Sequence, residues 1–365
     1  MTWATVKLGN VCNTASGGTP KRDRAEFYDG EIPWVKSGEL KDSLIKSTSE
    51  RISQLGLQNS SAKLIPKGTL LIAMYGATVG KLGILDIEAT SNQAVCAISP
   101  SARVNQKYLF HYLFKIRGKL IERSTGGAQP NISQDIIRNL EIPLPPVDEQ
   151  RRIAEVLDKA DALRQKRRLA LQKLDTLLQS VFLEMFGDPV RNPKGWEICT
   201  IRDLVSSVNY GTSEKAGEVG KYPILRMNNI TFQGGWSFDD LKYIDMSEKE
   251  RKKYFVRKGD ILFNRTNSKE LVGKTAVYRE NHEMAFAGYL IRVRTNDENN
   301  PEYISAFLNS QFGKLVLNNL CKNIIGMANI NAQELQNISI LRPPTDLQNK
   351  FALIVERVEA ARLRL

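Results

Sequence analysis

A chain of 365 residues is long enough for two domains of ordinary size, and its 42% hydrophobic and 25% charged content is typical of globular proteins. The formal net charge of +12 favours a polyanionic partner, with nucleic acid ahead of an anionic membrane because no basic amphipathic helix adjoins an apolar anchor. The opening MTWATVKLGN lacks the basic start and apolar core of a signal peptide, and no run approaches the roughly eighteen apolar residues of a membrane span. We therefore expect a cytoplasmic protein.

The cysteines and histidines argue against metal and His-based chemistry. The four cysteines lie far apart without zinc-ligand spacing, so we expect reduced thiols and no metal site. The only two histidines, His111 and His282, are interpreted as packed or surface residues. No nucleophile elbow or complete phosphate-binding loop occurs, and no catalytic residue is assigned. A hidden pair of acid and base carboxylates stays open at this point.

Residues 1–144 form the first predicted domain, and a long helix follows at 145–187. The domain mixes short β-branched segments with helical stretches and many Gly, Asn and Ser turns, which is an α+β pattern. Two prolines end it at Pro145-Pro146, and Asp148 is expected to cap the helix. About 38 residues without a helix breaker predict a helix of about 57 Å.

Apolar residues recur along this helix at spacings of three and four, which predicts a heptad seam and a partner helix. Its predicted contact positions are Ile153, Val156, Ala160, Leu163, Leu174, Leu177 and Val181.

The chain then repeats itself. A second predicted domain at 188–342 shares short segments with the first: IPKGTLLIAM matches VRKGDILFNR, VGK occurs at Val79 and Val272, and Asn131-Ile132 falls on Asn329-Ile330. A shorter helix at 343–365 copies the start of the long one, with Pro343 standing 198 positions after Pro145 (343 − 145). The two domains should therefore share a scaffold and differ in their loops.

The second helix is expected to carry Phe351, Ile354, Val358 and Ala361 in the same seam, and Thr345 with Gln348 is expected to form a capping box. An intramolecular coiled coil follows. Because the second helix has only about twenty residues, we expect half of the first, from Leu169 to Phe186, to lack a partner in the chain and to be covered by another protein subunit.

The repeated Pro-Pro-x-Asp-x-Gln helix start after two variable domains resembles the specificity (S) subunit of type I restriction-modification systems. NTASGGTPKR from Asn13, IPWVKSGEL from Ile32, ATSNQAVCAISP from Ala89 and FNRTNSKELVGKTAVY from Phe263 carry the likeness over nearly the whole chain. The resemblance implies two target recognition domains, each reading half of a bipartite DNA site. It also implies an antiparallel coiled coil that sets their spacing and docks two modification (methyltransferase) subunits.

Such a subunit would be non-catalytic and would bind no cofactor itself. S-adenosylmethionine, ATP and Mg²⁺ are implied for the modification and restriction subunits. Two other readings stay open: a coiled-coil adaptor without specific DNA readout, and a fused enzyme, for which the motifs are missing.

Base reading needs Arg or Lys for guanine and Asn or Gln for adenine, supported by phosphate contacts. Polar loops of the first domain supply the candidates Lys21, Arg22, Lys36, Ser37, Tyr75, Thr78, Gln129 and Asn131. The candidates of the second domain are Arg226, Asn228, Asn229, Asn264, Arg265, Thr266, Asn267, Lys322 and Asn323. For each, a turn, a helix cap or a core position is the competing interpretation.

Overall fold

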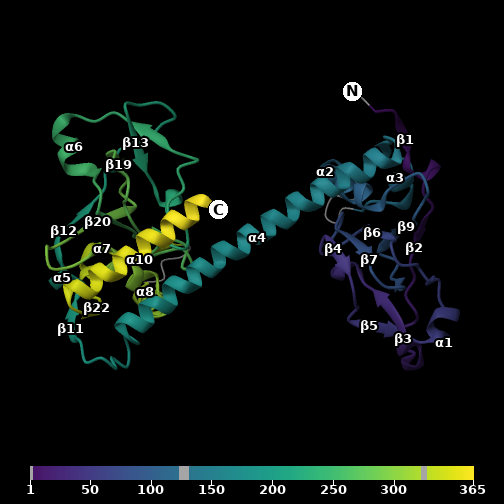
Figure 1. The fold of residues 1–365 in the computed structure, drawn as a ribbon, viewed down its shortest axis with the longest axis horizontal. Coiled ribbons are helices and arrows are strands. Elements are labelled where there is room, and N and C mark those ends of the chain that lie inside the picture. The colour runs from purple at the N-terminus through teal and green to yellow at the C-terminus, as the bar shows by residue number, and fades with distance from the viewer. Residues whose placement is uncertain (1–2, 123–130, 322–326) are drawn as a thin grey trace. The chain divides into compact units, whose positions relative to one another are not determined.

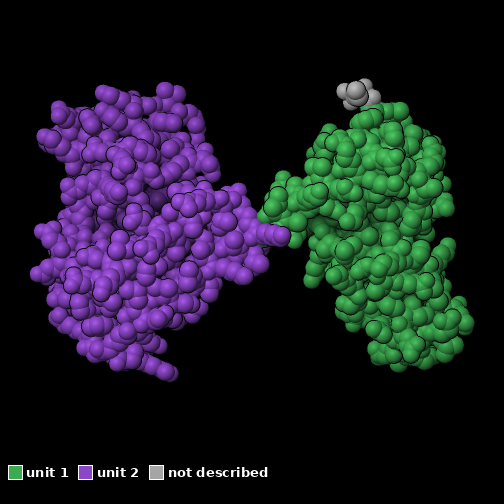
Figure 2. Space-filling view, in the orientation of Figure 1, with its two compact units in different colours: residues 1–165 green, residues 166–365 purple. Residues whose placement is uncertain are grey.

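The structure is a computed structural model that describes residues 3–122, 131–321 and 327–365, with helices and strands mixed along the chain (Figure 1). The chain divides into two compact units, residues 1–165 and 166–365 (Figure 2). The boundary between them falls inside the helix α4 (Val147–Phe186), which is one continuous helix of 40 residues. The four-part division at residues 144, 187 and 342 describes chain segments and stays an interpretation.

The described residues of unit 1 form three sheets. The five-stranded sheet has the order β2 (Thr14–Ser16), β9 (Val95–Ile98), β6 (Leu70–Ala73), β7 (Leu82–Leu85), β4 (Ser43–Ile45). The other sheets are β5 (Glu50–Ile52), β3 (Tyr28–Val35), β8 (Thr90–Ser91), and the antiparallel pair β1 (Thr5–Lys7) with β10 (Glu141–Pro143). Its shorter helices are α1 (Gln54–Gln58), α2 (Gln106–Glu122) and α3 (Gln134–Arg138), with 3₁₀ turns η1 (Leu8–Asn10), η2 (Ala25–Phe27) and η3 (Ser37–Glu39).

Unit 2 repeats this plan. Its four-stranded sheets have the orders β12 (Val205–Tyr210), β20 (Leu290–Thr295), β16 (Ile261–Asn264), β18 (Thr275–Val277) and β14 (Lys242–Ile244), β13 (Tyr222–Leu225), β19 (Met284–Phe286), β15 (Phe255–Val256). Two-stranded pairs join β11 (Glu197–Thr200) to β22 (Ser339–Arg342) and β17 (Thr266–Asn267) to β21 (Ala328–Asn329). Its helices are α5 (Ile201–Leu204), α6 (Glu248–Tyr254), α7 (Pro301–Asn309), α8 (Gln311–Leu320), α9 (Ala332–Gln336) and α10 (Thr345–Arg364), with the 3₁₀ turn η4 (Met227–Asn229).

The strand β6 lies in the middle of its sheet and is apolar along its whole length because both of its faces are buried. Leu70 and Ile72 face one cluster of buried side chains, while Leu71 and Ala73 face another. In unit 2, β16 does the same, with Ile261 and Phe263 on one side. Strands buried on both faces lose the polar alternation of a half-exposed strand, which is why both read as short apolar runs.

The two Val-Gly-Lys turns confirm the repeat at atomic detail. Gly80 and Gly273 have φ of +75° and +77°, a left-handed conformation that favours glycine. Each glycine N–H donates to the last residue of the preceding strand, to Ala73 O at 2.8 Å and to Asn264 O at 2.8 Å. The turn therefore has the same structural role in both units: it closes a hairpin between equivalent strands.

A buried glutamine locks the start of the long helix in each repeat. Gln150 accepts the backbone N–H of Asn105 at 2.8 Å and donates to the carbonyl of Pro145 at 2.8 Å. Gln348 accepts the backbone N–H of Asn300 at 2.9 Å and likewise donates to the first proline of its pair at 2.9 Å. The glutamine of the repeated motif thus joins α4 to the start of α2, and α10 to the start of α7.

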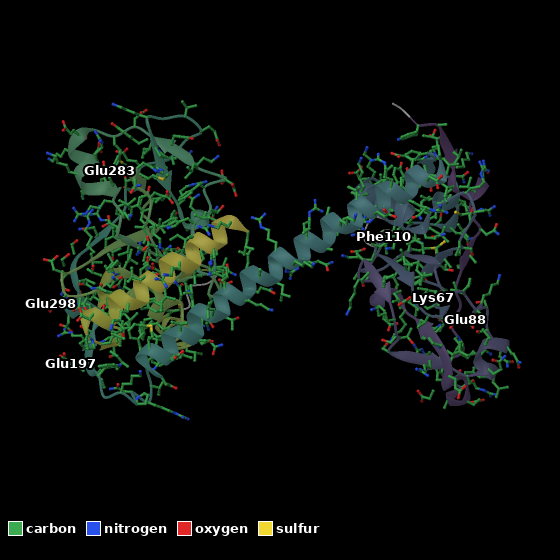
Figure 3. All side chains as sticks on the ribbon, viewed as in Figure 1. Lys67, Glu88, Phe110, Glu197, Glu283 and Glu298 are labelled. Atoms are coloured by element: carbon green, nitrogen blue, oxygen red, sulfur yellow. The ribbon has the colours of Figure 1, made fainter. Side chains whose placement is uncertain are left out.

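The predicted capping box between Thr345 and Gln348 is wrong. The Thr345 hydroxyl donates to the carbonyl of Glu298 at 2.6 Å, next to the first turn of α10 (Figure 3). Gln348 points inward and is fully buried. The loop before α7 binds both side chains, so neither is free to cap the backbone amides at the start of α10.

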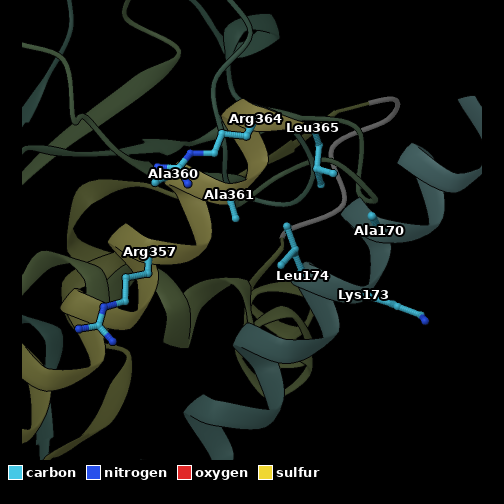
Figure 4. A pocket seen from close by; sticks show the side chains of 8 residues that line it. All are labelled: Ala170, Lys173, Leu174, Arg357, Ala360, Ala361, Arg364 and Leu365. Carbon is cyan, nitrogen blue, oxygen red and sulfur yellow. The ribbon is translucent and has the colours of Figure 1, made fainter. Parts of the chain in front are cut away.

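The helix α10 packs antiparallel on the C-terminal part of α4, within unit 2. The Phe351 ring lies 5.8 Å from Phe182 and 5.3 Å from Phe186, while Arg362, later in α10, pairs with Asp175, earlier in α4. Near the end of α10 the two helices border an open apolar groove (Figure 4), lined by Ala170, Lys173, Leu174, Arg357, Ala360, Ala361, Arg364 and Leu365. The antiparallel helix pair is confirmed.

The expectation that residues 169–186 lack a partner in the chain is wrong. Phe182 and Phe186 are 3% and 1% exposed, because α10 and the core of unit 2 cover them. Matching two repeats by sequence relates α10 to the first half of α4, whereas antiparallel packing places it on the second half.

The predicted seam residues accordingly divide between the two halves of α4. In the N-terminal half, Val156 and Leu163 are 56% and 66% exposed, so their contact with another protein stays a prediction. Leu177 is 46% exposed. Phe351 and Val358 are buried, and the half-buried members of the set are Ile153, Ala160, Leu174, Val181, Ile354 and Ala361.

Candidate nucleic-acid interface

One loop in each unit gathers the ends of several strands, and we call it the junction loop: residues 91–95 in unit 1 and 286–290 in unit 2. In unit 1, the N–H of Gly18 donates to Ser91 O at 2.8 Å, and that of Met74 to Ala94 O at 2.8 Å. The N–H of Asn92 donates to Val35 O at 2.9 Å. The segments that follow β2, β3 and β6 therefore meet at one edge.

The junction loop of unit 2 makes equivalent bonds. The N–H of Thr212 donates to Phe286 O at 3.0 Å, and that of Arg265 to Tyr289 O at 3.0 Å. The N–H of Ala287 donates to Leu225 O at 2.9 Å, which fixes the end of β13. The predicted DNA-contacting loops after β13 and β16 are thus brought together, although they lie far apart in the sequence.

In unit 1, two predicted contact residues share one carboxylate. Arg22 pairs with Glu50 at 2.7 Å, and Lys36 pairs with the other oxygen of the same group. The hydrogen bond from Lys36, followed by that from Arg22, holds the pKa of Glu50 below its usual range. Arg22 also lies over the rings of Tyr28 and Trp34, at 4.7 and 4.9 Å. Both cations are held in place, and the single Glu50 carboxylate offsets one of their two positive charges.

The remaining predictions in unit 1 fall on four segments, after β2, β3 and β6 and before α3. Lys21 is exposed beside Arg22, and Ser37 opens η3 after Lys36. Tyr75 forms an isolated antiparallel bridge with Asn131, and Thr78 lies half-buried in the same loop before the Val-Gly-Lys turn. Gln129 lies outside the described residues.

In unit 2, the loop after β13 contains three predicted DNA-contacting residues. One is exposed, and two form hydrogen bonds within the chain. Asn228 is exposed. Arg226 donates to the Asp240 carboxylate at 2.8 Å. Asn229 is 1% exposed, and its amide donates to Ser237 O at 2.9 Å and accepts the N–H of Arg226 at 2.8 Å. This geometry gives Asn229 a structural role in shaping the loop, and its DNA contact stays a prediction.

The segment after β16 contains four candidates with different environments. Asn264 is fully buried, and neither atom of its amide has a hydrogen-bond partner among the described residues. Thr266 is buried and donates to the Asn329 side chain at 3.0 Å, while Asn267 is half-buried. Arg265 is half-buried with its guanidinium 4.9 Å from the centre of the Tyr210 ring. Lys322 and Asn323 lie outside the described residues.

Residue-type reasoning missed the cations that anchor the Val-Gly-Lys turns. In unit 1, Lys81 pairs with Asp42 at 3.0 Å, and Arg117 of α2 donates to Gly80 O at 2.8 Å and to the same carboxylate. Burial alone would raise the pKa of Asp42, but bonds from the Leu82 N–H and the two cations outweigh it and hold the pKa below its usual range.

The equivalent lysines of unit 2 have no carboxylate partner among the described residues. Lys274 donates to the carbonyls of Met227 and Ile230 at 2.7 and 2.6 Å, and Lys314 to Gly273 O at 2.9 Å. Burial lowers the pKa of Lys274, and burial followed by the Lys274 charge lowers that of Lys314 to about 8. Lys274 therefore ties η4 to the turn, a role that only the match between the two Val-Gly-Lys segments could have suggested.

Two exposed tyrosines beside the unit 2 junction loop were also missed. Tyr210, at the end of β12, is 42% exposed, and Tyr289, inside the loop, is 53% exposed. Aromatic faces next to arginine are typical of nucleic-acid surfaces. In the sequence Tyr210 stands between Asn209 and Gly211, and Tyr289 between Gly288 and Leu290, and neither was among the predicted contact residues.

The described parts of the chain offer little for other classes of site. Within them, no helix is both long and apolar enough to cross a membrane. Nor do three or more His, Cys, Asp or Glu side chains gather there in a group that could hold a metal ion.

Two copies of one α+β domain, each followed by a long helix and each gathering polar loops at a junction, define a duplicated protein with paired recognition surfaces. The chain belongs to the family of the type I restriction modification DNA specificity domain, whose model matches residues 1–173 and 193–365.

Relatives extend over nearly the whole chain. The type I restriction enzyme EcoKI specificity subunit of Escherichia coli K12 is 24% identical over 98% of this chain and 81% of its own length. The MjaIX specificity subunit of Methanocaldococcus jannaschii is 25% identical, over 97% and 86%. A solved type I restriction-modification S subunit from M. genitalium matches with a TM-score of 0.63 at 14% identity, covering 99% of this chain and 90% of its own. The fold expected from the resemblance is therefore confirmed.

Proposed function

We propose that this chain is the DNA-specificity subunit of a type I restriction-modification complex. Each unit reads one half of a bipartite DNA site, and the helices α4 and α10 set the spacing of the halves and dock two modification subunits. Restriction subunits join the same assembly. The chain has no catalytic residue of its own, and S-adenosylmethionine, ATP and Mg²⁺ act in the partner subunits.

The observation that carries this proposal is the repeated junction with different side chains. The same backbone bonds hold Met74 in unit 1 and Arg265 in unit 2, and Ala94 in unit 1 and Tyr289 in unit 2. A shared frame with exchanged side chains suits two surfaces that read different sequences. The net charge of +12 suits a DNA partner. One solved relative, described in a study of complex assembly of the type I R-M system, matches with a TM-score of 0.54 at 20% identity and supports the same fold.

The decisive experiment is to express this chain with a modification subunit of its system in cells without other adenine methylation, and to map methylated adenines across the genome. The expected result is one bipartite motif with a fixed gap. A chain lacking residues 188–365 serves as the control and should not give that motif. Methylation without a shared motif, or an assembled complex that methylates no adenine, would favour a coiled-coil adaptor without specific DNA readout.

A further inference from the structure

Arg265 is held rigidly at the edge where the strands of unit 2 meet. Its N–H donates to Tyr289 O at 3.0 Å, and its carbonyl accepts the N–H of Ile330 at 2.9 Å. Its neighbours Asn264 and Thr266 are both buried. The backbone at this position is therefore fixed from both sides, and only the side chain is left to meet a ligand.

The side chain of Arg265 is also positioned before any ligand arrives. Its guanidinium carbon lies 4.9 Å from the centre of the Tyr210 ring. The Tyr210 hydroxyl accepts the N–H of Ala332 at 2.9 Å, which anchors the tip of the ring while the ring stays partly exposed. A guanidinium stacked on an anchored ring loses little rotamer entropy when it binds.

Arg265 differs from the other described arginine candidates in having no acidic partner. Arg22 pairs with Glu50, and Arg226 with Asp240. Among the described residues, the guanidinium of Arg265 has neither a carboxylate nor any other hydrogen-bond partner, and its buried Nε is unsatisfied. Its Nη groups, which no acceptor of the described residues holds, are therefore the donors that remain available to an acceptor supplied from outside the chain.

We propose that Arg265 reads a guanine in the half-site of unit 2, and that Tyr210 is its positioning residue. This inference rests on the proposed function. The two parallel N–H groups of a guanidinium match O6 and N7 of guanine in the major groove, and this pair is the commonest specific contact of its kind. Because Met74 occupies the equivalent backbone position in unit 1, the contact belongs to the second half-site alone.

The test uses the full chain assembled with its modification subunit and duplexes carrying the motif that the assembly methylates. Each guanine of the second half-site is replaced in turn by 7-deazaguanine, which lacks the N7 acceptor. One replacement should weaken binding by about fivefold to about 150-fold. Arg265→Ala should cost a similar factor on the natural duplex, and the two changes together should cost no more than one alone.

Three further variants separate base reading from other roles. Arg265→Lys keeps the charge and should keep the salt dependence while losing the preference at that base pair. Tyr210→Ala should weaken the same preference and no other, whereas Tyr210→Phe keeps the ring but loses the anchoring hydroxyl, and should retain more of the preference than Tyr210→Ala does. Arg202→Ala removes an exposed arginine of α5 and serves as the matched control.

The outcomes that overturn the inference are specific. Arg265→Ala could weaken all sequences equally and lower the salt slope by about one, which would make it a phosphate contact. A second half-site without any G·C pair, or one whose profile is unchanged by Arg265→Ala, would also overturn it. If the wild-type assembly binds no preferred sequence, the proposed function fails instead, and the two failures are distinguishable.

Discussion

The surface cations of this chain differ in how available they are to a DNA phosphate, because several of them already pair with a carboxylate. Glu50 holds Arg22 and Lys36, and Asp240 holds Arg226. A DNA phosphate would have to compete with these bonds, while an already ordered cation spares the entropy of ordering on binding. The pairing of each cation, which the net charge of +12 does not reveal, thus decides its availability.

Asp42→Asn tests the paired cluster behind the Val-Gly-Lys turn of unit 1. Asparagine suits the φ of +57° at this position, but it cannot neutralise Lys81 and Arg117. We expect the free energy of unfolding of unit 1 to fall by about 1.5–3 kcal/mol at pH 7, measured by hydrogen exchange of its strands. The matched control is Asp86→Asn, which removes one partner of an exposed ion pair with Lys67 and should have little effect.

The pH dependence of this effect has a defined sign. The pKa of Asp42 is lowered in the folded chain, so its stabilisation is present above the ordinary aspartate pKa of about 4 and is lost as pH falls below it. The wild type and Asp42→Asn should therefore converge in stability below about pH 4. A difference that stays constant from pH 7 to pH 3 would contradict the assignment.

At the scale of elements, the sequence predicts which helices form better than which segments touch. Apolar spacing and proline stops place α4 and α10 to within a few residues. The repeat correctly relates Gln150 to Gln348, because each locks a helix start to the equivalent neighbours in its own unit. The repeat could not predict which part of α4 contacts α10. Equivalent segments of two repeats need not touch, and antiparallel packing places α10 on the second half of α4, although its sequence matches the first half.

Phe351→Ala tests the packing of α10 on α4. Phe351 is fully buried against the rings of Phe182 and Phe186, so its truncation leaves a cavity in unit 2. We expect a loss of about 3–5 kcal/mol in the free energy of unfolding of unit 2, followed by hydrogen exchange in α10. Leu353→Ala, on the same helix and 57% exposed, should cost far less. Equal losses for the two variants would show that α10 does not pack as described.

At the scale of the whole molecule, the repeat and the resemblance predicted the two-domain plan, while the contact residues were harder to choose. Residue type selected Arg265 and Asn264 equally, yet one stacks on an exposed ring and the other is buried inside its sheet. Asn264 is the last residue of β16, whereas Arg265 follows the strand and is held by a bond to the junction loop, which is far away in the sequence. Such information lies in tertiary contacts.

Exchanging residues 1–144 for the first domain of another family member tests whether the halves read independently. In the described ranges, each unit contains its own sheets, buried clusters and junction loop, so the second should not depend on the first for its side-chain positions. We expect the methylated motif of the assembled chimera to change in one half only, with Arg265→Ala altering the other half in the same way in chimera and parent. A change in both halves, or a chimera in which Arg265→Ala has no effect, would mean that the two recognition surfaces are coupled.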